Sequence, residues 1–234
     1  MYYPNIRPAR FLERPNRFIA LCELEGETVR AHVKNTGRCA ELLTPGAQVF
    51  LQPAPAGAER KTRFSLISVY RGDMCVNIDS QAPNRVFDEA VSAGNLRLPG
   101  MDKLCEIRRE AIYGDSRLDF FLRDEKRAAY VEIKGVTLLE GSVARFPDAP
   151  TERGIKHLEA LSRAAEAGYQ AYAVFVIQLR GAVRFEPNER THAAFGESLR
   201  RAVAKGVFPV AVDCTVTPDS IAYRGFVPVH LGEE

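Results

Sequence analysis

The pattern of the sequence changes near Asp79, and this change constrains the fold more than any other feature. Before it, short apolar stretches are separated by turn residues such as Glu25-Gly26-Glu27 and Thr44-Pro45-Gly46, which is typical of an all-β barrel or sandwich. After it, helical and strand patterns alternate, which is typical of an α/β domain. The chain of 234 residues is long enough for two such domains. We therefore predict one domain at residues 1–82 and a second at residues 83–234.

The first region is predicted to form a small Greek-key barrel of the OB type, because five strands of ordinary length follow one another closely. A flexible loop is expected at residues 53–58, where proline, glycine and alanine cluster. The expected strands are residues 17–25, 28–34 and 47–52, and two more within 62–78 that join near Arg71-Gly72-Asp73.

The second region is predicted to form a mixed α/β sheet with three helices. The helix at residues 151–168 is the strongest, since Leu158, Leu161 and Ala165 recur at helical spacing and Gly168 ends it. The expected order is a helix at 86–94, strands at 104–114, 117–124 and 128–138, the helix at 151–168, a strand at 170–179, a helix at 191–206 and a strand at 207–216.

Basic residues are concentrated in the N-terminal part of the chain. The net charge is +2, but the first eighty residues carry 11 Lys and Arg against 8 Asp and Glu. Near the N-terminus, only Glu13 opposes the arginines of this basic arm, which are Arg7, Arg10, Arg14 and Arg17. The arm is either a surface that binds a polyanion or ordinary solvated charge.

Composition excludes several classes of protein. With 46% hydrophobic and 26% charged residues the chain is globular rather than disordered. No apolar run is long enough for a membrane helix and the N-terminus lacks a signal peptide, so we expect a cytoplasmic protein with no membrane partner. The five cysteines form no CxxC pair, which argues against a zinc site or a disulfide framework.

Two carboxylates and a lysine are expected to converge in the second region. Glu132 and Lys134 are two residues apart on one strand and therefore project from the same face. Asp119 occupies similar apolar surroundings on the preceding strand, and antiparallel pairing of the two strands would bring it beside Glu132. The alternative is that the three residues form a structural ion-pair cluster at the end of the sheet.

Electrostatic repulsion indicates what such a cluster would require. Two carboxylates about 4 Å apart repel by about 4 kcal/mol at an effective dielectric constant of about 20, so one must be protonated or a cation must lie between them. Oxygen ligands without nearby cysteines or paired histidines favour Mg²⁺ or Mn²⁺, bound by Asp119 and Glu132. Lys134 would then orient or deprotonate water for attack on a phosphoryl group.

A second concentration of polar residues lies at residues 146–157. Thr151 can cap the following helix, so the residues from Asp148 to Glu152 could serve only to begin it. The same helix start, followed by Arg153, Lys156 and His157, is also typical of a phosphate-binding arrangement. Gln178, at the end of an apolar strand, is expected to face the same cleft.

Five segments together resemble the sugar fermentation stimulation protein A (SfsA) family. The resemblance runs through almost the whole chain, and FPDAPTERGIKHL is its most specific stretch. The other segments are HVKNTGRCAELLTPGAQVFL, SRLDFFL, YVEIKGVTL and VFVIQL.

The resemblance implies a DNA-binding protein with an N-terminal OB-like domain and a C-terminal domain similar to PD-(D/E)XK nucleases. It implies that Asp119 and Glu132 are the acids and Lys134 the lysine of the catalytic motif, with Glu89 as a further acid from the first helix. This family's NTG loop is often followed by Ser-Met, whereas Arg38-Cys39 follows it here, so its partner is expected to differ. The residues expected to contact DNA are Arg14, Arg17, Asn35, Arg38, Arg153 and Lys156, with Asp148 as a further candidate in the cleft.

Three functions remain open from the sequence. The first is a Mg²⁺- or Mn²⁺-dependent hydrolase that cleaves DNA, which the acid, acid and lysine set favours. The second is a non-catalytic DNA-binding regulator of sugar metabolism genes that uses a nuclease-like fold, which the description of the family favours. The third is an OB module that binds an oligosaccharide or a protein.

Overall fold

The computed structural model describes residues 1–35, 37–55, 57 and 62–232 of the chain. Thr36 of the NTG loop lies outside the described residues, as do Ala56 and Ala58 of the loop expected at 53–58.

The N-terminal part is a closed five-stranded OB barrel, as predicted. Antiparallel pairing joins the barrel strands in the order β3-β2-β1-β4-β5, and a short parallel pairing of Ala31 with Phe64 closes the barrel between β3 and β5. A sixth strand, β6, extends the sheet beyond β5. The strands are β1 (Arg7–Asn16), β2 (Ile19–Leu24), β3 (Glu27–His32), β4 (Gln48–Pro53), β5 (Phe64–Arg71) and β6 (Met74–Asn77).

Strand β1 was not predicted, because the sequence pattern indicated only a basic arm there. The strand pairs with both β2 and β4, so the arm is an integral part of the barrel. Phe11 is its only fully buried residue, and Pro8 and Pro15 interrupt the apolar alternation that marks a strand. The structure therefore fixes the backbone of the basic arm in the barrel wall.

The C-terminal part is a mixed sheet with few helices, also as predicted. The strand order is β15-β14-β12-β9-β8-β7, in which β12 runs parallel to β9 and β14 while the other neighbours are antiparallel. The elements are α1 (Ala82–Ser92), β7 (Glu106–Tyr113), β8 (Ser116–Arg123), β9 (Ala128–Val136), α2 (Glu152–Glu166), β12 (Gln170–Ile177), α3 (Glu189–Ala204), β14 (Val207–Thr217) and β15 (Ser220–Val227).

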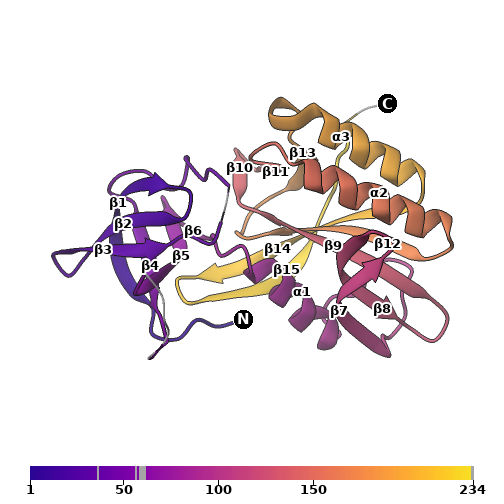
Figure 1. The fold of residues 1–234 in the computed structure, drawn as a ribbon, viewed down its shortest axis with the longest axis horizontal. Helices are drawn as coiled ribbons and strands as arrows, with labels where there is room; N and C mark the ends of the chain where they lie inside the picture. The colour runs from indigo at the N-terminus through magenta and orange to yellow at the C-terminus, as the bar shows by residue number, and fades with distance from the viewer. Residues whose placement is uncertain (36, 56, 58–61, 233–234) are drawn as a thin grey trace.

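Helices cover both faces of this sheet (Figure 1). Alternate residues of β9 and β12 point to opposite faces, so Val131 and Val174 pack with α1, whereas Phe175 packs with α2 and α3.

The capping hydroxyl of Thr151 accepts a hydrogen bond from Gly154 N (3.1 Å) and so begins α2, and Gly168 follows the last turn of this helix with φ of 89°.

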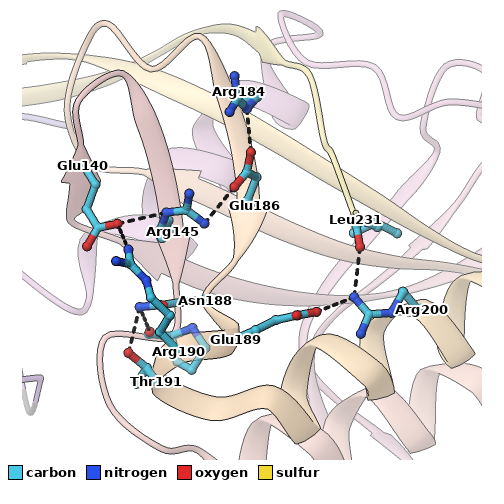
Figure 2. A network of polar contacts seen from close by, with 11 residues as sticks. Glu140, Arg145, Arg184, Glu186, Asn188, Glu189, Arg190, Thr191, Arg200 and Leu231 are labelled. Atoms are coloured by element: carbon cyan, nitrogen blue, oxygen red, sulfur yellow. Dashed lines mark hydrogen bonds and ion pairs between the residues drawn. The ribbon is translucent and has the colours of Figure 1, made fainter. Parts of the chain in front are cut away.

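A small three-stranded sheet lies beside the main one and was not predicted. It consists of β10 (Leu138–Glu140), β11 (Val143–Phe146) and β13 (Arg184–Pro187), in the order β10-β11-β13. Arg145 on β11 forms ion pairs with Glu140 (3.0 Å) on β10 and Glu186 (2.7 Å) on β13, and Arg190 at the start of α3 also pairs with Glu140 (Figure 2). This ion-pair network ties the small sheet to α3.

The barrel and the mixed-sheet domain contact each other through the β14–β15 hairpin and through the segment that follows β6. The hairpin extends toward the barrel (Figure 1), where Pro218 O accepts a hydrogen bond from Ser68 Oγ (2.9 Å). Lys34 forms an ion pair with buried Asp79 (2.8 Å), just before α1. In the described part of the chain, no helix is long and apolar enough to cross a membrane.

Candidate active site

Asp119 and Glu132 meet where strands β8 and β9 separate. Pairing of these strands ends at Phe120 and Val131. Beyond this point, Asp119 Oδ2 takes the place of a strand partner and accepts a hydrogen bond from Ile133 N (2.7 Å), while Asp119 Oδ1 accepts one from Asn84 Nδ2 (2.8 Å) on α1. Where the two strands separate, both carboxylates line one cleft.

Lys134 and His157 hold the Glu132 carboxylate from two sides. Lys134 Nζ donates to Glu132 Oε1 (2.6 Å), and His157 Nδ1 on α2 contacts the same oxygen. Arg153 donates from Nε to His157 Nε2 (3.4 Å), so this ring nitrogen is the acceptor and the ring proton belongs on Nδ1, facing Glu132. The second oxygen, Glu132 Oε2, is buried without any hydrogen-bond partner among the described residues.

The two carboxylates have opposite electrostatic environments. Burial raises the pKa of Asp119, and the negative charge of Glu132 raises it further. Burial also tends to raise the pKa of Glu132, but the hydrogen bond with His157 and the charge of Lys134 outweigh that effect and hold the pKa below its usual range. Glu132 is thus the stable anion of the pair, and Asp119 is the carboxylate that gains most from an added cation.

The cleft around these residues has a volume of about 630 Å³ and basic walls. One wall consists of Ser80 and Gln81, the first turn of α1 and Arg109 of β7. The opposite wall is the first turn of α2. The basic residues that line the whole cleft are Arg85, Arg109, Lys134 and Arg153, and the acidic ones are Asp119 and Glu132.

Four of the residues expected near the cleft lie outside it, namely Glu89, Asp148, Lys156 and Gln178. Lys156 is exposed and does not line the cleft, because it immediately precedes the inward-facing His157 and is therefore turned by about 100° around the helix axis. Glu89 accepts a hydrogen bond from the N-terminal ammonium of Met1 (2.6 Å), about one turn beyond the part of α1 that lines the cleft. Arg153 does line the cleft, as expected.

Gln178 does not face the cleft but lies buried between the two domains. Its side-chain amide donates to Asn77 Oδ1 (3.0 Å) and to Asp79 O (3.0 Å), where the chain leaves the barrel. Asp148 also lies elsewhere, in a separate hollow together with Arg38. Burial raises the pKa of Asp148, and its Oδ2 lies so close to Gly37 that a Cβ atom there would come within 2.0 Å of it.

The expected DNA contacts of the barrel fall into two groups. Arg14 is occupied internally, because its guanidinium donates to the carbonyl oxygens of Arg17, Asn35, Gly37 and Arg38 at 2.6–2.9 Å. Asn35 Oδ1 accepts from Gly37 N (2.8 Å), so this side chain also shapes the loop. The side chains of Arg17 and Arg38 are exposed and remain accessible to a ligand.

Sequence reasoning missed several residues of the cleft, and although it placed His157 in the phosphate-binding arrangement at the start of α2, it did not foresee the contact of this histidine with Glu132. The signal for this contact was weak: His157 follows Gly154 by three residues and precedes Leu158 on the buried stripe of α2, where a polar side chain needs a partner. Asn84, Arg85 and Arg109 gave no signal, since α1 and β7 reach the carboxylates only through tertiary packing.

The fold and the cleft define a two-domain protein in which an OB barrel precedes a mixed-sheet domain with a carboxylate–lysine cluster. Family models match both parts: the SfsA N-terminal OB domain at residues 12–78, and the sugar fermentation stimulation protein RE domain at residues 81–220. The chain belongs to the sugar fermentation stimulation protein (SfsA) family.

Individual relatives match over the whole chain. A sugar fermentation stimulation protein homolog from Desulfitobacterium hafniense is 52% identical, with 100% of both chains covered. One from Clostridium beijerinckii is 48% identical over 99% of this chain and 100% of its own. The structure of Pyrococcus furiosus SfsA in complex with Ca²⁺ matches with a TM-score of 0.88 and 31% identity, covering 98% of each chain.

Proposed function

We propose that this protein binds DNA and hydrolyses its phosphodiester bonds with the help of a divalent metal ion held by Asp119 and Glu132. The observation that carries the proposal is the pair of adjacent carboxylates beside Lys134, in a cleft with basic walls. A surface that served only to bind a polyanion would gain nothing from two adjacent carboxylates facing it.

The residues present fit a hard divalent ion. Among the described residues, Glu132 Oε2 is buried without a hydrogen-bond partner, and each oxygen of Asp119 accepts only one hydrogen bond. No group of three or more His, Cys, Asp or Glu residues within the described ranges could enclose a metal. Two carboxylates suffice for Mg²⁺ or Mn²⁺, which commonly complete their coordination with water and substrate phosphate. The related Pyrococcus furiosus protein, solved with Ca²⁺, supports a divalent ion in this family.

The side chains around the carboxylates have distinct roles in the proposed reaction. The metal ion, when bound, supplies positive charge that stabilises the phosphoryl group and activates water. Asn84 and Ile133 N fix the orientation of Asp119, and His157 fixes that of Glu132. Lys134 stabilises negative charge that develops on the attacked phosphate, and Arg153 holds a phosphate oxygen at the start of α2.

The alternative function is a DNA-binding regulator without catalytic activity. One observation favours it: Glu132 is already paired with Lys134 and His157, so the cluster satisfies part of its charge without a metal. In that case the OB barrel and the exposed arginines would bind DNA, and the cluster would stabilise the sheet.

A cleavage assay separates these functions. Wild-type protein is expected to cleave DNA in Mg²⁺ or Mn²⁺ and not in EDTA, while Glu132→Gln and Lys134→Ala should reduce the rate by roughly 10²–10³-fold or more. Glu159→Gln, on the exposed side of α2, is the matched control and should cleave normally. Binding of DNA without cleavage under all these conditions would support the regulator.

A further inference from the structure

We infer that Arg85 and Arg109 form a second phosphate-binding wall, opposite Arg153, and that the cleft therefore takes a polynucleotide through several consecutive phosphates rather than a single phosphate ester. The inference rests on the proposed function, which places the reacting phosphate between Asp119 and Glu132. It adds which residues hold the neighbouring phosphates and what class of substrate they select.

The arginines reach the cleft from opposite sides of the carboxylates. Arg85 belongs to the first turn of α1 and Arg109 to β7, whereas Arg153 belongs to the first turn of α2. The two helices cover opposite faces of the sheet, and both begin at this cleft. A polynucleotide backbone that passes over the carboxylates would therefore contact Arg153 on one side and Arg85 with Arg109 on the other.

These arginines are available to a ligand. Among the described residues, Arg85 and Arg153 have no carboxylate partner, and Arg153 donates only to His157. Arg109 has a long contact of 3.8 Å with Asp88, and its side chain is 53% exposed. Exposed arginines without close partners lose little by turning toward a phosphate, with which they can form paired hydrogen bonds.

The charge of the cleft exceeds what one phosphate requires. Lys134 balances Glu132 directly, so a divalent ion beside Asp119 would leave the three arginines uncompensated. A single phosphodiester group carries one negative charge and cannot neutralise such a site.

Salt dependence of DNA binding tests the inference without involving the metal. The affinity of a fluorescently labelled short DNA duplex is measured in EDTA at several NaCl concentrations, so that no cleavage occurs. Affinity falls as salt rises, and for each phosphate contact that is lost the steepness of the plot of log affinity against log salt should decrease by about 0.9. We expect this fall in Arg85→Ala, in Arg109→Ala and in Arg153→Ala, and restoration of the slope in Arg85→Lys.

Arg108→Ala is the matched control. Arg108 precedes Arg109 on β7 and is similarly exposed (59%), but it does not line the cleft, so its replacement should leave the slope unchanged. A normal slope in both Arg85→Ala and Arg109→Ala would overturn the inference, as would an equal loss in Arg108→Ala, which would indicate only general surface charge. If the expected slopes are found but Mg²⁺ and Mn²⁺ give no cleavage, the second wall stands and the proposed catalysis fails.

Discussion

At the scale of single residues, the partners of an arginine decide its role. Arg14 and Arg10 lie on the same strand and looked equivalent in the sequence. The structure separates them, because Arg14 donates to four backbone carbonyl groups whereas Arg10 is exposed. Arg14 therefore holds the backbone of Asn35, Gly37 and Arg38, and the side chain of Arg10 remains accessible to a ligand.

This difference predicts opposite outcomes for two alanine substitutions. Arg14→Ala removes the charged donor shared by four carbonyl groups, two of them in part-buried hydrogen bonds, and should lower the free energy of unfolding by about 3 kcal/mol, a melting-temperature loss of roughly 6–12 °C, with little change in the salt slope of DNA binding. Arg10→Ala should leave the melting temperature nearly unchanged and reduce the slope by about 0.9. The interpretation is wrong if Arg14→Ala melts normally and reduces the slope.

The predictable part of the site is the part that lies on strands. Asp119, Glu132 and Lys134 follow from side-chain alternation and from antiparallel pairing of consecutive strands. The other residues of the cleft, such as Asn84 and Arg109, come from elements whose approach depends on packing across the sheet. Sequence periodicity shows which face of an element is buried, but it does not show which residues of two separate elements meet.

At the scale of elements, most long segments were predictable, apart from strands β1 and β15, and the very short ones were not. The barrel strands β2–β6 and the helices α1–α3 all occur close to their expected positions. Strands β10, β11 and β13 have only three or four residues each, too few for periodicity to mark them. Tertiary contacts join them, such as the ion pair of Glu186 on β13 with Arg145 on β11, and Arg184 pairs with Glu186 within β13.

These ion pairs predict a pH-dependent effect of Glu186→Gln. The hydrogen bond from Arg184, together with the charge of Arg145, lowers the pKa of Glu186. A carboxylate with a lowered folded-state pKa stabilises the protein above its unfolded pKa, and this stabilisation is lost as the pH falls through the folded value. Glu186→Gln should therefore cost about 1 kcal/mol at neutral pH, and the difference from wild type should disappear below about pH 4.

Thermal unfolding at neutral and acidic pH measures this difference. Glu197→Gln, at an exposed position of α3, is the control and should resemble wild type at both values. A constant difference between Glu186→Gln and wild type at all pH values would show that shape rather than charge is responsible.

At the scale of the whole molecule, the junction between the domains connects the barrel to the cleft. Ser80, which lines the cleft, donates from Oγ to Lys34 O of the barrel (2.9 Å), and buried Gln178 bonds to Asn77 and Asp79 at the exit of β6. These partners are 46 and about 100 residues apart in the sequence, so the sequence predicted two domains without indicating how they meet. DNA bound to the barrel near Lys34 would thus lie beside the cleft.

Direct titration with Mn²⁺ tests the central claim, that Asp119 and Glu132 form a divalent-metal site. The free ion is followed by its electron paramagnetic resonance signal, with and without duplex DNA. Wild type, Lys134→Ala and the control Glu159→Gln should bind Mn²⁺ saturably, and DNA should strengthen binding by adding phosphate ligands. Glu132→Gln should weaken it roughly 100-fold or more. Absence of saturable binding by wild type at millimolar Mn²⁺ with DNA present, or unchanged binding by Glu132→Gln, would contradict the account and leave a structural ion-pair cluster.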